Sequence, residues 1–222
     1  MIKENKLAIN GGDAIITKEF PPYNTIGKEE INAAIKVMQS GNLSGFIGAN
    51  GQGFNGGEKV LELEHEVCKF FKVKHCISVN SWTSGLIASV GAIGIEPGDE
   101  IIVTPWTMVA TATAILHWNA IPIFIDIDAS TFNIDPKKIE KAITQKTRAI
   151  LTADIFGQSA DIDIILEIAS KYNLKVISDT AQSPGAFYKG KHAGTLSDLG
   201  GFSLNYHKHI HCGEGGLVVT ND

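Results

Sequence analysis

The chain has 222 residues, 44% hydrophobic content and a formal net charge of −5. This composition can build a substantial hydrophobic core, and the acidic balance argues against nucleic-acid binding, because phosphate contacts need clustered Lys and Arg. The three cysteines include no CxxC pair, so neither a disulfide framework nor a cysteine zinc site is favoured, and a reducing cytoplasm fits best. No apolar signal core follows the N-terminal charges, which argues against secretion.

The first 28 residues show little periodicity. Pro21-Pro22 stiffens this segment, so residues 1–28 are expected to form an extended arm that lies on another surface. A helix is predicted next, ending near Gly41, from apolar residues at helical spacing: Ile31, Ala34, Ile35 and Met38. The glycine-rich residues 45–57 then form either a functional loop or a mobile linker.

From Glu58 onward, helical stripes alternate with short apolar runs. Helices are predicted around residues 60–71, 86–93, 109–116, 136–143 and 161–172. Strands are predicted at residues 75–79, 100–104, 121–125, 148–153, 174–178 and 217–219. Repeated β-α units with nearly continuous apolar strands predict an α/β fold with three layers, in which helices cover both faces of a mainly parallel sheet.

Residues 101–125 contain no Asp, Glu, Lys or Arg, a length that could suggest a membrane span. Pro105 and Pro122 interrupt the segment, and its pattern divides into strand, helix and strand. A buried β-α-β passage is therefore the better interpretation, and no membrane contact is expected.

Two motifs near the end of the chain indicate a cofactor site. An apolar run ends in Asp179, and Lys208 stands later among small, polar and aromatic residues before a glycine-rich turn. Ligands bind at the carboxyl ends of strands in open α/β sheets. A pyridoxal phosphate site needs an acid that keeps the pyridine nitrogen protonated and a lysine that forms the Schiff base. A surface-loop Lys208 and a capping or ion-paired Asp179 remain the simpler alternatives.

These motifs resemble one known family. The stretches Asp179-Thr180-Ala181-Gln182, Phe202-Ser203 through Lys208, and Gly213-Glu214-Gly215-Gly216 are similar to the DegT/DnrJ/EryC1/StrS sugar aminotransferases, which are fold-type I pyridoxal-phosphate enzymes. The resemblance runs from about residue 20 to residue 222. It implies a large cofactor-binding domain at residues 29–222, incomplete and without the small C-terminal domain of the family, so that the end of the chain is expected to be a truncation.

The resemblance implies pyridoxal 5′-phosphate as the cofactor and assigns roles around it. Lys208 would hold the cofactor covalently and afterwards move a proton between the substrate carbon and the cofactor carbon. Asp179 would bond the pyridine nitrogen, and Gln182 would contact the ring or its hydroxyl. The resemblance also favours an active-site loop at residues 45–57.

The phosphate is expected at Ser81-Trp82-Thr83-Ser84-Gly85, where a strand feeds the start of a helix with free backbone amides. The resemblance assigns Thr83 and Ser84 to phosphate-contacting positions and Ser203 as a further phosphate ligand. Alternatively, the hydroxyl groups at this helix start only cap the helix. Relatives frequently have glycine at the position of Trp82, so the resemblance does not define the conformation of this loop. Trp106 would stack on the cofactor ring, or alternatively be a core aromatic.

Four further residues remain without a role. Asp154 ends a predicted strand where many relatives carry histidine. His207, His209 and His211 would share one face of an extended segment, as a zinc site requires, but no fixed carboxylate partner is visible. One branch of the family has histidine in place of the lysine and catalyses dehydration; here the spacing from Phe202-Ser203 selects Lys208, which favours transamination.

The resemblance therefore implies transfer of an amino group from glutamate or glutamine to a keto-sugar nucleotide or keto-cyclitol. The resemblance also implies a homodimer with its sites at the interface. Two alternatives remain open at this stage. One is a dehydratase on the same scaffold, and the other is a cofactor-binding or regulatory protein without turnover.

Overall fold

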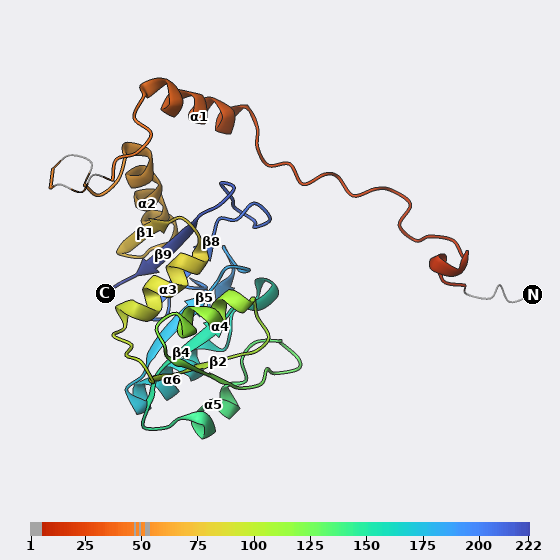
Figure 1. Ribbon diagram of the computed structural model, residues 1–222. Helices are drawn as coiled ribbons and strands as arrows, with labels where there is room; N and C mark the ends of the chain where they lie inside the picture. The colour runs from red at the N-terminus through yellow and green to blue at the C-terminus, as the bar shows by residue number, and fades with distance from the viewer. Residues whose placement is uncertain (1–5, 47, 49, 52–53) are drawn as a thin grey trace, which may run out of the picture.

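The computed structural model describes residues 6–46, 48, 50–51 and 54–222 (Figure 1). Part of the predicted glycine-rich loop lies outside these residues, namely Ile47, Ala49, Gln52 and Gly53. The described part of the chain forms a seven-stranded sheet with the strand order β1-β9-β8-β5-β4-β2-β3.

The sheet is mainly parallel, as the sequence predicts. Its strands are β1 (His75–Val79), β2 (Glu100–Val103), β3 (Ile121–Phe124), β4 (Thr147–Ala153), β5 (Lys175–Asp179), β8 (Leu199–Ser203) and β9 (Gly216–Thr220). Only β9 runs against its neighbours, pairing antiparallel with both β1 and β8. A separate ribbon joins β6 (Phe187–Tyr188) to β7 (Lys191–His192). Strand β8 was not predicted, because Gly200 and Gly201 interrupt its apolar run.

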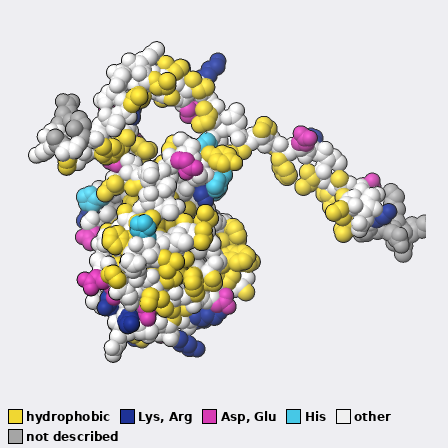
Figure 2. Space-filling view, viewed as in Figure 1, with side chains coloured by type: hydrophobic (Ala, Val, Ile, Leu, Met, Phe, Trp, Pro, Cys, Tyr) yellow, Lys and Arg dark blue, Asp and Glu magenta, His cyan; other side chains and the backbone are white. Residues whose placement is uncertain are grey.

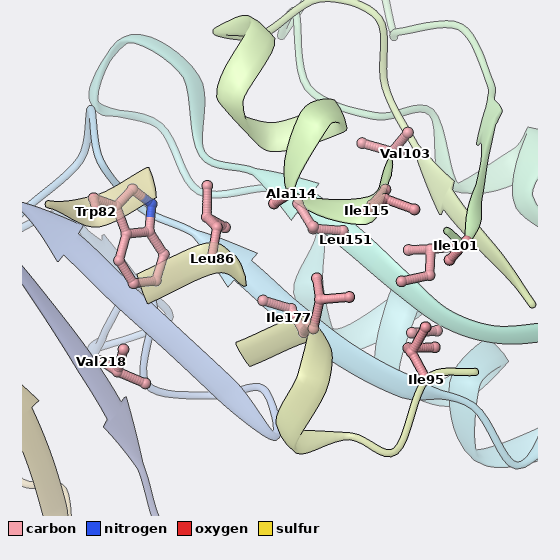
Figure 3. Close-up of a cluster of buried hydrophobic side chains, with 13 residues drawn as sticks. Trp82, Leu86, Ile95, Ile101, Val103, Ala114, Ile115, Leu151, Ile177 and Val218 are labelled. Atoms are coloured by element: carbon pink, nitrogen blue, oxygen red, sulfur yellow. The ribbon is translucent and has the colours of Figure 1, made fainter. Parts of the chain in front are cut away.

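Helices cover both faces of the sheet. They are α2 (Glu58–Phe71), α3 (Trp82–Ala92), α4 (Val109–Leu116), α5 (Pro136–Ala142) and α6 (Ile162–Tyr172), with a short 3-10 turn η2 (Ile155–Gly157) after β4. Ile101 of β2 and Leu86 of α3 belong to one buried cluster, shown in Figure 3. The next residue of β2, Ile102, packs with Ile165 of α6 on the other face. The three-layer α/β fold is thereby confirmed.

Side-chain caps fix two helix starts. The Ser81 hydroxyl accepts the Ser84 N–H at 3.1 Å at the start of α3, and Asp135 accepts the Lys137 N–H at 3.0 Å at the start of α5. Ile139 and Ile143 face inward, as the sequence predicts, since Ile139 belongs to a buried cluster and Ile143 packs against it. Helix α5 ends at Ala142, and Ile143 has extended backbone angles.

The uncharged segment 101–125 forms β2, α4 and β3, as the sequence predicts. Among the described residues, no helix combines the length and the apolar character that crossing a membrane requires.

The N-terminal segment extends away from the body of the molecule (Figure 1). It contains a 3-10 turn η1 (Ala8–Asn10) and helix α1 (Lys28–Ser40), which has no buried residue. The apolar side chains predicted for this helix therefore lie open, with Ile31 50% and Met38 70% exposed. Apolar atoms are visible along much of the segment in Figure 2. Tyr23, in the stretch before α1, contacts the body of the molecule, because its hydroxyl donates to the Lys208 carbonyl.

Candidate active site

A cavity of about 560 Å³ opens at the carboxyl ends of the parallel strands β4, β5 and β8. Six of the seven predicted site residues line it: Thr83, Trp106, Asp179, Gln182, Ser203 and Lys208. The seventh, Ser84, does not line the cavity, because both its amide and its hydroxyl face the Ser81 hydroxyl. The edge of a parallel sheet thus gathers side chains that lie more than a hundred residues apart in sequence.

Asp179 ends β5 and is only 6% exposed. Its Oδ1 accepts the Trp82 indole N–H at 2.7 Å and the Ala181 amide at 3.2 Å, and its Oδ2 accepts the Thr111 hydroxyl at 2.7 Å. Burial raises the pKa of Asp179, whereas these donors and the charge of Lys208 act to lower it. The site therefore holds a buried carboxyl group whose ionised form depends on its hydrogen-bond donors.

Lys208 is half-buried on the loop between β8 and β9. The base of this loop is closed by a hydrogen bond from the Cys212 amide to the Leu204 carbonyl at 3.1 Å. A second hydrogen bond joins the two sides of the loop, because the Asn205 side-chain amide donates to Glu214 Oε1 at 2.6 Å. Since β8 pairs with β5 beside Asp179, the loop brings the lysine to the cavity that contains the carboxyl group.

The start of α3 forms another wall of the cavity. Ser81 and Thr83 line it from the first turn, where helical N–H groups lack partners within the helix. Ser203, which ends β8 and is 7% exposed, lines it from the sheet. Such an arrangement of amides and hydroxyls is suited to an anionic group.

The orientation of the Gln182 amide is set by its backbone partner. Its Oε1 accepts the Phe156 N–H at 3.2 Å, so the Nε2 group remains available as a donor to the cavity.

Phe156 and Phe132 have positive φ angles of 54° and 62°. Together with Trp106 they form a row of partly exposed rings, with centroids 5.9 Å apart for Trp106 and Phe132.

Asp154 lies next to Asp179 at the sheet edge and is 3% exposed. Its Oδ1 accepts the Ala160 amide at 2.8 Å, and its Oδ2 accepts the Thr180 hydroxyl at 2.7 Å. Burial raises the pKa of Asp154 to about 6, and the neighbouring Asp179 adds to the increase. A residue without a sequence-derived role is therefore the second buried carboxyl group of this cavity.

Comparison with known proteins identifies the family. The model of the DegT/DnrJ/EryC1/StrS aminotransferase family matches residues 24–222. The chain belongs to this family. Its relatives include GDP-perosamine synthase from Caulobacter vibrioides, which is 42% identical over 166 residues, or 75% of this chain and 45% of that protein. The chain spans about half the length of the curated relatives it matches.

Solved structures of the family share the fold. An aminotransferase from Psychrobacter cryohalolentis matches with a TM-score of 0.85 and 33% identity, over 92% of this chain and 50% of that one. A GDP-4-keto-6-deoxy-D-mannose-3-dehydratase from E. coli, with bound hydrated PLP, matches with a TM-score of 0.80 and 30% identity, over 90% of this chain and 50% of that one. The chain therefore shares its fold both with a protein named as an aminotransferase and with one named as a dehydratase.

Sequence reasoning missed several contacts that shape this DegT/DnrJ/EryC1/StrS site. Trp82 and Thr111 both donate to Asp179, and Phe156 donates to Gln182. Trp82 stood out in the sequence only as a departure from a frequent glycine. The partners of these donors lie on other elements, so no local pattern could identify them.

The histidines of the Lys208 loop do not form the alternative zinc site. His207 lines the cavity, whereas His209 and His211 do not. Across the part of the chain that the structure describes, no three His, Cys, Asp or Glu side chains gather closely enough to hold a metal ion. His211 instead contacts the Thr25 side chain of the N-terminal segment.

Proposed function

We propose that this chain is the cofactor-binding part of a pyridoxal-phosphate-dependent aminotransferase. The amino group would pass from glutamate or glutamine to a keto-sugar nucleotide or a keto-cyclitol. One observation carries the proposal: the buried Asp179 carboxyl group and the Lys208 side chain line the same cavity. Relatives named as aminotransferases of an oxo-sugar nucleotide and of 2-deoxy-scyllo-inosose support the two substrate classes.

The residues of the cavity fit pyridoxal 5′-phosphate. When bound, this cofactor supplies an electron sink for a carbanion next to the amino nitrogen. Asp179, with its ionised form stabilised by the Trp82 and Thr111 donors, would accept a hydrogen bond from the pyridine N–H and keep that nitrogen protonated. Gln182 would donate Nε2–H to the ring hydroxyl oxygen, since its Oε1 is occupied by Phe156.

The phosphate would lie at the start of α3. Thr83 and Ser203 would donate hydroxyl protons to it, and the first-turn amides would add the favourable end of the helix dipole. Ser84, which the sequence predicted here, is replaced in this proposal by Ser81, because Ser81 lines the cavity and Ser84 does not. Trp106, which also lines the cavity, would stack on the ring and exclude water.

Lys208 would act as the base of the reaction. Its Nζ would take a proton from the substrate carbon and return it to the cofactor carbon, which is the proton movement that transamination needs. The hydrogen-bonded base of the β8–β9 loop holds this side chain at the cavity. Because proton transfer requires contact distance, loss of the amine should stop turnover without removing the cofactor pocket.

A dehydratase is the second candidate, supported by the E. coli structure and by His207, which lines the cavity beside Lys208. In the dehydratase branch of the family a histidine replaces the lysine, whereas Lys208 is retained here. We therefore favour transamination. A regulatory protein that binds the cofactor without turnover shares the same pocket and differs only in reactivity.

A homodimer in a reducing cytoplasm is part of the same proposal. The exposed apolar side chains of α1 and of the N-terminal segment support a partner surface. The three free cysteines, Cys68, Cys76 and Cys212, suit a reducing compartment.

The visible absorption spectrum of the cofactor-loaded protein tests the proposed reaction. Adding glutamate or glutamine without a sugar should convert the cofactor band, and adding a keto-sugar nucleotide should restore it. Lys208→Ala should bind the cofactor and show neither change. An aminated sugar product would support transamination, a product that has lost a hydroxyl group would favour the dehydratase, and a band that no donor changes would favour passive binding.

A further inference from the structure

Trp82 occupies a narrow slot between α3 and the sheet. It is 5% exposed and lies at one end of the cluster shown in Figure 3, near Leu86 and Val218. A Cβ atom added at Gly201 of β8 would come within 2.1 Å of the indole ring, and one at Gly85 of α3 within 2.6 Å. Only glycine fits at these two positions, so the ring is held in one orientation.

The indole nitrogen is directed at a carboxyl oxygen. Trp82 Nε1 donates to Asp179 Oδ1 at 2.7 Å, across 97 positions of sequence. Thr111 of α4 donates to Oδ2, and its own hydroxyl lies 2.8 Å from the Thr107 hydroxyl. Donors from two different helices therefore hold the two oxygens of one carboxyl group.

Counting lone pairs shows which oxygen remains available. A carboxylate has about four acceptor positions, two on each oxygen. Oδ1 uses both of its positions, for Trp82 and for the Ala181 amide at 3.2 Å. Oδ2 accepts only from Thr111, which leaves one position for a ligand. The protein thus presents one defined oxygen of Asp179 to the cavity.

We propose that Trp82 is a positioning residue of the site: its indole N–H fixes the rotation of the Asp179 carboxylate, keeps it ionised, and presents Oδ2 to a protonated heteroaromatic nitrogen. This inference rests on the proposed function. Asp154 from the end of β4 and Lys208 from the β8–β9 loop are the titratable groups that face Asp179.

The physical basis is the cost of burying a charge. Burial raises the pKa of Asp179 and so favours a neutral carboxyl group, which would no longer hold a pyridinium N–H. A hydrogen bond to the ionised group opposes this effect and is among the stronger ones in proteins. Replacing Trp82 with phenylalanine would keep an aromatic ring in the slot, remove the donor and reduce the packed volume, so a packing variant without a donor is needed beside it.

The contact itself can be tested in the cofactor-free protein. Indole N–H resonances of the three tryptophans are recorded by NMR with ¹⁵N-labelled tryptophan, and Trp82→Phe identifies the signal of Trp82. We expect this resonance to shift as Asp179 titrates and to move strongly in Asp179→Asn, whereas those of Trp106 and Trp118 change little. A Trp82 signal that is unchanged by Asp179→Asn would overturn the proposal.

The role is tested by comparing Trp82→Phe with Val218→Ala, a packing variant of the same cluster. Trp82→Phe should raise the dissociation constant of pyridoxal phosphate about tenfold, since a hydrogen bond to a charged group is lost. It should also shift the pH dependence of binding, because Asp179 then becomes protonated at higher pH. Val218→Ala should change stability and leave both properties as in the original chain.

Two outcomes separate this inference from the proposed function. Equal affinity and pH dependence in Trp82→Phe and Val218→Ala would reduce Trp82 to a packing residue, with the aminotransferase proposal intact. Failure of the unsubstituted protein to bind pyridoxal phosphate would contradict the proposed function and the positioning role together. In that case, a Trp82 indole resonance that still shifts as Asp179 titrates would show that the hydrogen bond exists but has only a structural role.

Discussion

Asp154 and Asp179 are joined through their backbones at the carboxyl edge of the sheet, where the Asp154 N–H donates to the Asp179 carbonyl at 2.9 Å. Two buried carboxyl groups thereby share one cavity. Each accepts a backbone amide and a threonine hydroxyl, from Ala181 and Thr111 for Asp179 and from Ala160 and Thr180 for Asp154. The Trp82 indole is a further donor to Asp179. Trp82 lines the cavity together with Asp179, whereas the Ala160 amide ties Asp154 to the loop after β4.

Asp154→Asn should remove a pH-dependent loss of stability. Burial raises the pKa of Asp154 from 3.8 to about 6, so its contribution is full below pH 3.8 and is lost as the pH rises through 6. Relative to the variant, the original chain should lose up to about 3 kcal/mol of unfolding free energy between pH 4 and pH 7.

Chemical denaturation at several pH values measures this difference. Asparagine can keep both contacts, since Oδ1 can accept from Ala160 and Nδ2 can donate to the Thr180 hydroxyl. Parallel stability curves for the two proteins across pH 4 to 7 would show that Asp154 titrates normally in the folded state.

Gln182 offers a test of amide orientation. Gln182→Glu keeps an oxygen for the Phe156 N–H and replaces the Nε2 donor with an anionic oxygen. It should weaken pyridoxal phosphate binding more than Gln182→Ala, which should weaken it about tenfold. Absorption titration measures both dissociation constants, with thermal unfolding of the cofactor-free variants as the control. Unchanged affinity in Gln182→Glu would place the Gln182 amide away from the cofactor.

The exposed face of α1 offers a test of the proposed dimer. Ile35→Lys should leave the stability of the single chain within about 0.5 kcal/mol, because Ile35 is 43% exposed and packs into no buried cluster. If α1 contacts a second copy, the same substitution should weaken self-association at least tenfold in sedimentation equilibrium. Lys36→Ala is the matched control on this helix. Equal self-association in the original chain and Ile35→Lys would place the dimer contact elsewhere.

The sequence predicts the sheet well because its strands are nearly continuous apolar runs between amphipathic helices. The carboxyl ends of parallel strands lie at one edge of the sheet. The sequence therefore predicted that Asp179 and Lys208 lie close together. Strand β8 was missed because Gly200 and Gly201 lower its apolar character. The structure gives the reason for Gly201: the Trp82 ring leaves no room for a side chain there.

The finer geometry of the site depends on contacts between distant segments. No local pattern indicates that Trp82 bonds Asp179 or that Phe156 orients Gln182, since the partners lie on separate elements. The resemblance assigned Thr83 and Ser84 to the phosphate site. In the structure Ser81 contacts the amide and the hydroxyl of Ser84 and lines the cavity, a contact that the sequence did not indicate.

Borohydride reduction of the pyridoxal-phosphate-loaded protein, followed by peptide mapping, tests the central claim most directly. It is applied to this chain, to a form extended to the length of its relatives, and to Lys208→Ala. We predict a stable cofactor label on the peptide that contains Lys208, and its loss in Lys208→Ala. A label on another lysine, or none in either folded form, would contradict the account, because the Asp179 and Lys208 cavity would then not be the cofactor site.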